Sequence, residues 1–279
     1  CYLYHALSDQ QLSELFDQLH AEAAKRRREV WLAASIKQRI AREYKPLWPS
    51  LWKLSMDHLN LDLVDMVNGD IVPEELGEGG IFLVPIFNAR FCEMLCEELD
   101  HFDASGLPMG RPNSMNNHGV LLDELGMTEG LILPLMHEWI KPLCARFNLF
   151  LPESEGLDYA KAYVVRYRKG EDENLFMHVD NSEVTLNVSL GRTFEAGELA
   201  FFGLRSEPRP PPPFYHDWED EGVGYAVLHR GQELHCPLPI SDGERINLVI
   251  WMRSTQWRRE HGCPMCGTNK SLLKRLETK

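Results

Sequence analysis

The chain has 279 residues, of which 44% are hydrophobic and 10% aromatic, enough apolar material for one large domain with an appended region or for two modest domains. Its formal net charge of −13 argues against a general phosphate-binding surface, because nucleic-acid affinity depends on Lys and Arg side chains that neutralise phosphates. No apolar stretch approaches the roughly 18 residues that a membrane span requires, and the seven cysteines lack the regular spacing of a disulfide framework.

These properties predict an intracellular, soluble protein of the cytoplasm or nucleus. The chain begins at Cys1 rather than at a methionine, so we expect it to be a fragment, and a targeting segment upstream of Cys1 stays open.

The first part of the chain is expected to be a helical N-terminal region, residues 1–79. Residues 8–45 have apolar side chains at helical spacing, and "SDQQ" supplies Ser8 as the N-cap and Gln11 to bond back to it. The basic run "KRRRE" within this helix indicates a solvated face. The segment "GEGG", residues 77–80, is typical of a joint between this region and a compact domain.

A strand and two helices are expected after the joint. "IFLVPIF" favours a strand, and "NARFCEMLCEELDHF" favours a helix that Asn88 caps and that buries an apolar stripe. Cys92 and Cys96, at positions i and i+4 of this helix, are expected to pack in the interior. A second helix is expected from Thr128 to Phe147.

The pattern then changes to short β-rich runs separated by Gly, Asp and Pro clusters. The runs are "YAKAYVVRY", "EVTLNVSLG", "GELAFFGL", "GYAVLH" and "ERINLVIWMR". Several short strands after a helical layer predict an α+β fold in which a β-sandwich or barrel is buttressed by helices. We assign residues 80–259 to this domain. "EPRPPPPFYHDWEDEG" within it is typical of a rigid surface loop, and a binding segment for a proline-recognition module is the alternative.

Residues 260–279 are expected to form a C-terminal tail. Here "HGCPMCG" places Cys263 and Cys266 at C-x-x-C spacing beside His261. The sequence has no second C-x-x-C pair to complete a tetrahedral zinc site. An ordinary surface loop is therefore favoured over a structural zinc site, which stays open as an alternative.

The segment "FMHVDNSEVTLNVSLG" contains the candidate metal ligands His178 and Asp180. On an extended backbone alternate side chains share a face, so this imidazole and this carboxylate point toward one position. His101 and Asp103 have the same spacing, but they stand at the end of an expected helix, where residues i and i+2 do not face each other.

The segment "VLHRGQELHCPLPISDGERINLVIWMR" contains a third candidate ligand, His235, and Arg245 follows it ten positions later. Two His and one Asp leave three adjacent positions of an Fe(II) ion open, enough for a chelating 2-oxo acid and O2. The guanidinium of Arg245 can hold the far carboxylate of such an acid bidentately. His229 is the competing third ligand, but ten residues after it stands Pro239, which cannot hold a carboxylate.

These segments, together with "AYVVRYRKG" and "AGELAFFG", resemble the 2-oxoglutarate- and Fe(II)-dependent oxygenases of the prolyl and lysyl hydroxylase branch. The resemblance covers roughly residues 80–268. It implies a double-stranded β-helix, or jelly roll, with iron held by His178, Asp180 and His235. It further implies 2-oxoglutarate held by Arg245, with Tyr167 reaching into the same pocket, O2 as the oxidant and ascorbate as the reductant. The chain carries Arg at position 245, as lysyl hydroxylases do, where collagen-type prolyl hydroxylases carry Lys.

Alternation along "EVTLNVSLG" would aim Thr185, Asn187 and Ser189 into the barrel. We expect Thr185 and Ser189 to fill the interior, although contact with the cosubstrate is the alternative. For Asn187, packing and cosubstrate contact are equally open.

The expected function is the hydroxylation of a side chain of a polypeptide substrate, with release of succinate and CO2. One alternative is an inactive scaffold that binds 2-oxoglutarate without turnover. Another is an oxidative nucleic-acid demethylase, which the negative net charge disfavours because such an enzyme needs a basic groove. The segment "RPNSMNNHG" is a candidate for substrate contact, with turn formation by its Asn and Gly residues as the alternative.

Overall fold

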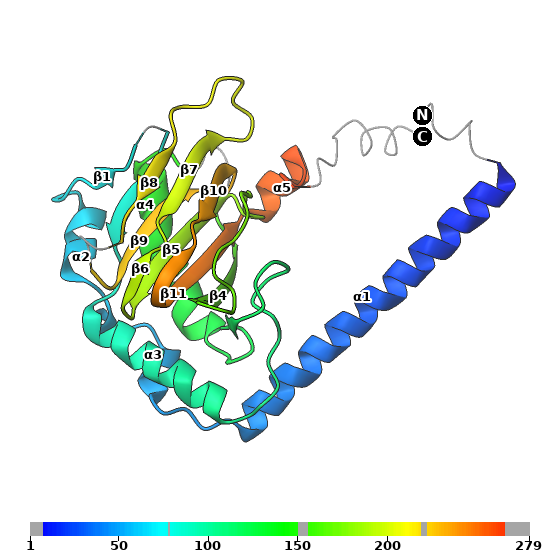
Figure 1. Cartoon of the computed structure of the whole chain (residues 1–279), viewed down its shortest axis with the longest axis horizontal. Coiled ribbons are helices and arrows are strands. Elements are labelled where there is room, and N and C mark those ends of the chain that lie inside the picture. The colour runs from blue at the N-terminus through cyan, green and yellow to red at the C-terminus, as the bar shows by residue number, and fades with distance from the viewer. Residues whose placement is uncertain (1–7, 78, 150–155, 219–221, 266–279) are drawn as a thin grey trace.

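The computed structural model describes residues 8–77, 79–149, 156–218 and 222–265. Figure 1 shows a body of strands and helices from which one long helix projects. The helices are α1 (Asp9–Glu43), α2 (Leu61–Asn68), α3 (Ala89–Ala104), α4 (Lys141–Arg146) and α5 (Thr255–His261). Two short 3-10 turns, Pro49–Trp52 and Met56–His58, connect α1 to α2.

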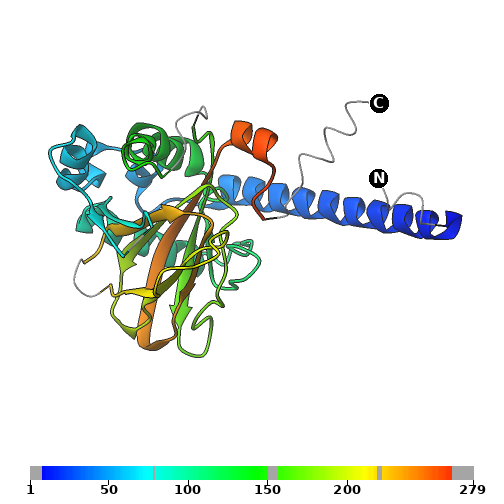
Figure 2. The same ribbon diagram turned by 90° about the horizontal axis from the view of Figure 1, so that it is seen from above.

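Helix α1 begins with the capping box expected from the sequence. The Ser8 amide donates to the Gln11 side chain over 2.8 Å, and the Gln11 amide donates to the Ser8 hydroxyl. Ile40 is its buried residue, because only the last turns of α1 reach the body. Figure 2 shows the remainder of the helix extending away from the strands.

Helix α3 confirms the expected cap and the expected apolar stripe. The Asn88 side chain accepts a hydrogen bond from the Phe91 amide over 2.9 Å, which satisfies one of the free N–H groups at the helix start. The buried face is formed by Phe91, Cys92, Leu95, Cys96, Glu98, Leu99 and Phe102. Burial raises the pKa of the Cys96 thiol to about 11, as expected for a cysteine that packs in the interior.

The helix expected from Thr128 to Phe147 is divided into three pieces. The turns Thr128–Ile132 and Leu135–Ile140 have the wide π-helical hydrogen-bonding pattern, and α4 follows them. Pro134 and Pro142 carry no amide hydrogen, so the regular i→i−4 pattern cannot run through the segment without a break.

The strands form two antiparallel sheets. The larger has the order β1-β2-β9-β5-β11-β4-β3, with β6 paired to β11. Its strands are β1 (Glu74–Glu75), β2 (Phe82–Pro85), β3 (Gly119–Leu121), β4 (Tyr159–Arg168), β5 (Val184–Gly191), β6 (Phe194–Ala196), β9 (Tyr225–Arg230) and β11 (Ile240–Arg253). The smaller has the order β10-β7-β8, formed by β7 (Leu199–Leu204), β8 (Phe214–His216) and β10 (Glu233–Pro237). This arrangement confirms the α+β fold, the strand expected at "IFLVPIF" and the five strands expected from the β-rich runs.

Helices cover one face of the larger sheet, and α3 packs against β5 there. Leu186, Val188 and Leu190 of β5 lie in this core together with Ile40 and the buried residues of α2 and α3. Since side chains alternate along a strand, the other face of β5 is turned toward the smaller sheet. The site lies on that second face. In the part of the chain that the structure describes, no helix is long and apolar enough to cross a membrane.

Candidate metal and cosubstrate site

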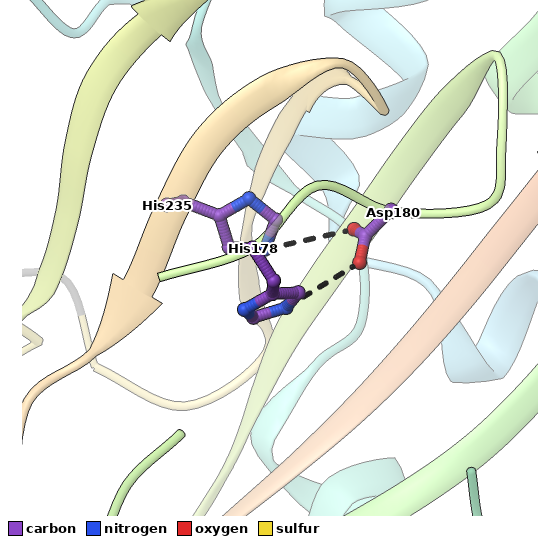
Figure 3. A group of neighbouring side chains, drawn as sticks. All are labelled: His178, Asp180 and His235. Carbon is purple, nitrogen blue, oxygen red and sulfur yellow. Dashed lines mark ion pairs between the residues drawn. The ribbon is translucent and has the colours of Figure 1, made fainter. Parts of the chain in front are cut away.

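Two segments far apart in the sequence bring His178, Asp180 and His235 together, as Figure 3 shows. His178 and Asp180 precede β5, and His235 lies on β10. The segments are joined by a pair of backbone hydrogen bonds: the His178 amide donates to the His235 carbonyl over 2.9 Å, and the His235 amide donates back over 3.0 Å. One potential ligand atom from each residue falls within 4.8 Å of the others.

The hydrogen bonds of both imidazoles leave the correct nitrogen available to a metal. Nδ1 of His178 lies 2.7 Å from the Phe176 carbonyl, and Nδ1 of His235 lies 2.9 Å from the Glu233 carbonyl. A carbonyl only accepts, so each Nδ1 carries the proton and each Nε2 keeps a lone pair. The two Nε2 atoms lie 3.6 and 3.7 Å from the two carboxylate oxygens of Asp180. This donor set fits a divalent transition metal.

Burial sets the protonation of the three groups. It lowers the pKa of His178 to about 4, an effect that His235 reinforces, and it lowers the pKa of His235 to about 4. Both imidazoles are therefore neutral near pH 7, which is the form that binds a metal. Burial also raises the pKa of Asp180 to about 6, because a carboxylate is costly in this interior. A bound cation would offset that cost.

Asp180 is held in place by hydrogen bonds from residues around it. The Thr185 hydroxyl on β5 donates to Oδ2 of Asp180 over 2.7 Å, and Gln232 donates to the Asp180 backbone carbonyl over 3.1 Å. Contacts of this kind fix the orientation of a ligand and thereby tune its affinity for metal.

The competing histidines lie outside this group. His229 on β9 is fully buried, its Nδ1 lies 2.8 Å from the Arg230 carbonyl, and its ring packs against those of Phe201 and His235. At the end of α3, Nε2 of His101 contacts the Lys45 carbonyl. Asp103 there pairs with Arg166 instead of approaching a histidine.

The three residues form part of the wall of a cavity between the two sheets. The wall is completed by Asn113, Asn116, Tyr163, Val165, Tyr167, Leu175, Thr185, Asn187, Leu199, Pro237, Arg245 and Val249. Of the eight site residues expected from the sequence, seven line this cavity. Ser189 is buried farther along β5 and does not line it.

Arg245 is 2% exposed and carries its charge into this cavity without a carboxylate partner among the described residues. Its Nε donates to the Asn247 side chain over 2.8 Å, and Nη1 donates to the Gly197 carbonyl. The guanidinium carbon lies 5.0 Å from the ring centre of Tyr167 and 5.6 Å from that of Trp218. Burial lowers the pKa of Arg245 to about 10, so the group remains charged near pH 7. A buried, unpaired cation of this kind calls for an anionic ligand.

Several residues that line this cavity or contact Arg245 were not identified from the sequence. Asn247 stands two positions after Arg245 and Tyr163 four before Tyr167, so strand alternation could have placed both on the same face. Trp218 belongs to the polyproline excursion, and no sequence signal placed it over Arg245. Asn113 and Asn116 belong to "RPNSMNNHG", which was expected as a candidate for substrate contact.

The described residues include only one of the two cysteines of the C-terminal C-x-x-C motif. Cys263 follows α5 and is half-buried, whereas Cys266 lies outside the residues that the structure describes. The zinc site therefore stays a hypothesis.

Comparisons with known proteins agree with this geometry. A sequence model of the OGFOD2-like domain matches residues 40–153. The chain is 37% identical to 2-oxoglutarate and iron-dependent oxygenase domain-containing protein 2 of Xenopus tropicalis, over 96% of the chain and 79% of that protein. It is 27% identical to procollagen-lysine,2-oxoglutarate 5-dioxygenase 1 of Mus musculus, over 62% of the chain and 24% of that protein. The crystal structure of a prolyl 4-hydroxylase from Phytophthora capsici superposes with a TM-score of 0.50 at 17% identity, covering 82% of the chain and 77% of that structure. The last likeness confirms the jelly-roll fold.

Proposed function

The chain belongs to the family of the 2-oxoglutarate and iron-dependent oxygenase domain-containing protein 2, and we propose that it hydroxylates a side chain of a polypeptide substrate. In the proposed reaction 2-oxoglutarate and O2 are consumed, succinate and CO2 are released, and one oxygen atom enters the substrate. Ascorbate would serve as the reductant that keeps the iron in its ferrous form.

We assign the iron to His178, Asp180 and His235. Two neutral imidazoles and one carboxylate would hold the ion and leave coordination positions for exchangeable ligands. When bound there, Fe(II) supplies the activation of O2 that the oxidation of a C–H bond requires. The residues around it hold these ligands in their metal-binding form through the Nδ1 contacts and the Thr185 hydroxyl.

The observation that carries this proposal is the buried, unpaired guanidinium of Arg245 in the same cavity as the three ligands. A 2-oxo dicarboxylate is complementary to both features, since one end chelates a metal and the other carries a carboxylate. We therefore assign the far carboxylate of 2-oxoglutarate to Arg245. Tyr167 and Asn187 line the space between Arg245 and the metal group and would orient the cosubstrate there, with Thr185 beside the metal group.

Three observations support a polypeptide substrate. The Mus musculus relative acts, by its name, on procollagen-lysine. The net charge of −13 disfavours a long phosphate backbone, whose binding needs an extended basic surface. The cavity is also lined by Asn116, whose side-chain nitrogen has no hydrogen-bond partner among the described residues and is able to donate to a peptide carbonyl.

The test measures succinate formed from 2-oxoglutarate by the full chain with Fe(II) and ascorbate. His178→Ala, Asp180→Ala and His235→Ala should each abolish turnover and lower the iron content measured by mass spectrometry of the metal. Protein from a cell lysate, treated with the active chain or with His235→Ala, would then be searched for peptides that have gained one oxygen atom.

Each alternative function gives a distinct result. An inactive scaffold would bind 2-oxoglutarate in a calorimetric titration but form no succinate with any substrate pool. A nucleic-acid demethylase would respond to methylated single-stranded DNA or RNA, release formaldehyde and leave all peptides unoxidised. Either result would overturn the proposed function.

A further inference from the structure

Two cations, Lys161 of β4 and Arg253 at the end of β11, lie on the face of the sheet that carries the site. Side chains on β11 alternate, so Arg253 shares the face of Arg245. In the pairing of β11 with β4, Lys161 is opposite Trp251, and Arg253 is opposite the next residue of that face, Tyr159. We call Lys161 and Arg253 the cation pair.

The cation pair lies on the opposite side of the metal group from Arg245. Trp251 is paired with Thr185, the residue that bonds to Asp180, so the metal group lies level with Trp251. Arg245 stands six positions before this level along β11 and Arg253 two positions after it. A cosubstrate held by Arg245 therefore leaves the cation pair available to a substrate that enters from the other side.

Both cations are close to the residues of the site. Nε of Arg253 donates over 2.6 Å to the backbone carbonyl of Asn181, the residue that follows Asp180. Nζ of Lys161 lies 5.4 Å from the ring centre of Tyr163, which lines the cavity, and 5.7 Å from that of Trp251. These contacts fix where the two positive charges sit relative to the metal group.

Neither cation has a carboxylate partner within 4.0 Å among the described residues. Lys161 donates no hydrogen bond to them, and the two terminal nitrogens of Arg253 have no acceptor there. Three acids of the neighbouring segments accept hydrogen bonds from other groups. Glu183 accepts from Arg258 over 2.8 Å and from the Ser254 amide, Glu124 accepts from the Gly110 amide, and Asp158 accepts from the amide and hydroxyl of Thr255.

The arrangement is costly without an anion. Both side chains are half-buried, and burial lowers the pKa of each. The charge of Arg253 lowers the pKa of Lys161 further, and the charge of Glu124 raises it in part. For Arg253, the charge of Arg258 lowers the pKa and that of Glu183 raises it. Like charges that share a partly desolvated site repel, and a bound anion removes that repulsion.

We propose that Lys161 and Arg253 bind the carboxylate of an acidic residue that lies close in the substrate sequence to the residue that becomes oxidised. This inference rests on the proposed function and adds a sequence preference to it. A single carboxylate suits two cations. A nucleic-acid backbone carries a charge on every nucleotide and would meet a chain whose net charge is −13.

The test uses three degenerate peptide libraries, each with a random central residue. The residues that flank the centre are Asp or Glu in the acidic library, Gln in the neutral library and Lys in the basic library, called the Lys library below. The full chain with Fe(II), 2-oxoglutarate and ascorbate would be given each library, and peptides that gain one oxygen atom would be quantified. We expect the acidic library to be oxidised about tenfold faster than the Lys library at low salt, and the ratio to fall at high salt.

Variants assign the preference to the cation pair. Lys161→Gln should lower the ratio of acidic to Lys-library rates, and Lys161→Glu should invert it. Arg253→Gln provides an independent variant on the other strand. Because each result is a ratio of two rates in the same variant, a loss of activity common to both libraries does not affect it. Lys169→Gln, which removes an exposed charge just after the last residue of β4, is the matched control and should keep the ratio of the unmodified chain.

Equal rates with the three libraries would overturn the inference and leave the proposed function intact. A preference that Lys161→Glu and Arg253→Gln both preserve would also overturn it, because the charge would then be recognised elsewhere. Oxidation of single-stranded nucleic acid together with no oxidised peptide in any library would overturn the proposed function and this inference with it.

Discussion

Thr185 donates its hydroxyl hydrogen to Oδ2 of Asp180 over 2.7 Å, so the second residue of β5 holds the carboxylate of the candidate metal group. Thr185→Val keeps the shape of the side chain but removes this hydrogen bond. We expect iron affinity to fall roughly 10- to 100-fold, the usual cost of losing a contact that orients a ligand. Metal titration would measure the iron affinity of each variant. Thr185→Ser keeps the hydroxyl and should restore most of that affinity. Unchanged iron binding in Thr185→Val would contradict this role.

Substitutions of Arg245 should affect cosubstrate binding and stability to different extents. Arg245→Met should raise the 2-oxoglutarate concentration for half-maximal turnover by a large factor, since losing one side of a buried charge pair costs about 2 to 5 kcal/mol. Iron binding should change little, and Arg245→Lys should restore turnover only in part. Arg245→Met removes a buried charge that has no carboxylate partner among the described residues, but it also takes a donor from the Asn247 and Gly197 oxygens. These two contributions oppose each other, so the free energy of unfolding should change little. Steady-state kinetics and chemical denaturation measure the two effects, and an unaltered cosubstrate requirement would exclude the assigned role.

The same substitution at His229 and at His235 should distinguish a histidine that packs in the interior from one that binds the metal. The His229 ring packs in T-shaped contact with Phe201 and its Nε2 has no hydrogen-bond partner among the described residues. His229→Phe should therefore retain iron and turnover, whereas His235→Phe should lose both. Iron content and succinate formation check this pair. The reverse outcome would show that the ligand set is wrong.

Glu98 attaches the N-terminal region to α3. It is fully buried and accepts hydrogen bonds from the Tyr44 hydroxyl, the Leu47 amide and the Trp48 amide. Glu98→Leu should lower the free energy of unfolding by about 3 kcal/mol or more, because three donors lose a charged acceptor. Glu97→Leu, which removes one partly exposed acceptor of the Trp48 indole, is the control and should cost about 1 kcal/mol. Equal losses in urea denaturation would contradict the special role of Glu98.

Glu233 makes stability depend on pH. Burial raises its pKa from 4.5 to about 7, so the folded chain holds this proton more tightly than the unfolded chain does. The contribution is fully present below pH 4.5 and is lost as the pH rises through about 7. As the pH rises from 4.5 to about 7, the free energy of unfolding should therefore fall less in Glu233→Gln than in the unmodified chain. Parallel pH–stability curves for the two proteins would show that Glu233 does not titrate in this way.

The sequence by itself determined much of the local structure and predicted the candidate metal ligands. Ser8 and Gln11 specify the start of α1 and Asn88 that of α3, because a cap acts on amides within three residues of it. Alternation in β4, β5 and β11 fixed which side chains share a face. His178 and Asp180 were identifiable as a pair because two positions on an extended backbone point the same way.

Only the tertiary structure decided which distant groups meet. His235 joins His178 through backbone pairing between segments more than fifty residues apart, and no local pattern contains that contact. Ser189 shares a strand face with Thr185 and Asn187 but lies outside the cavity, which alternation along β5 alone did not reveal. The unpaired state of Arg245, Lys161 and Arg253 was likewise invisible in a chain with 42 acidic residues. Whether a buried cation finds a carboxylate is settled by packing, since desolvation and pairing act over a few ångströms in space and not along the chain.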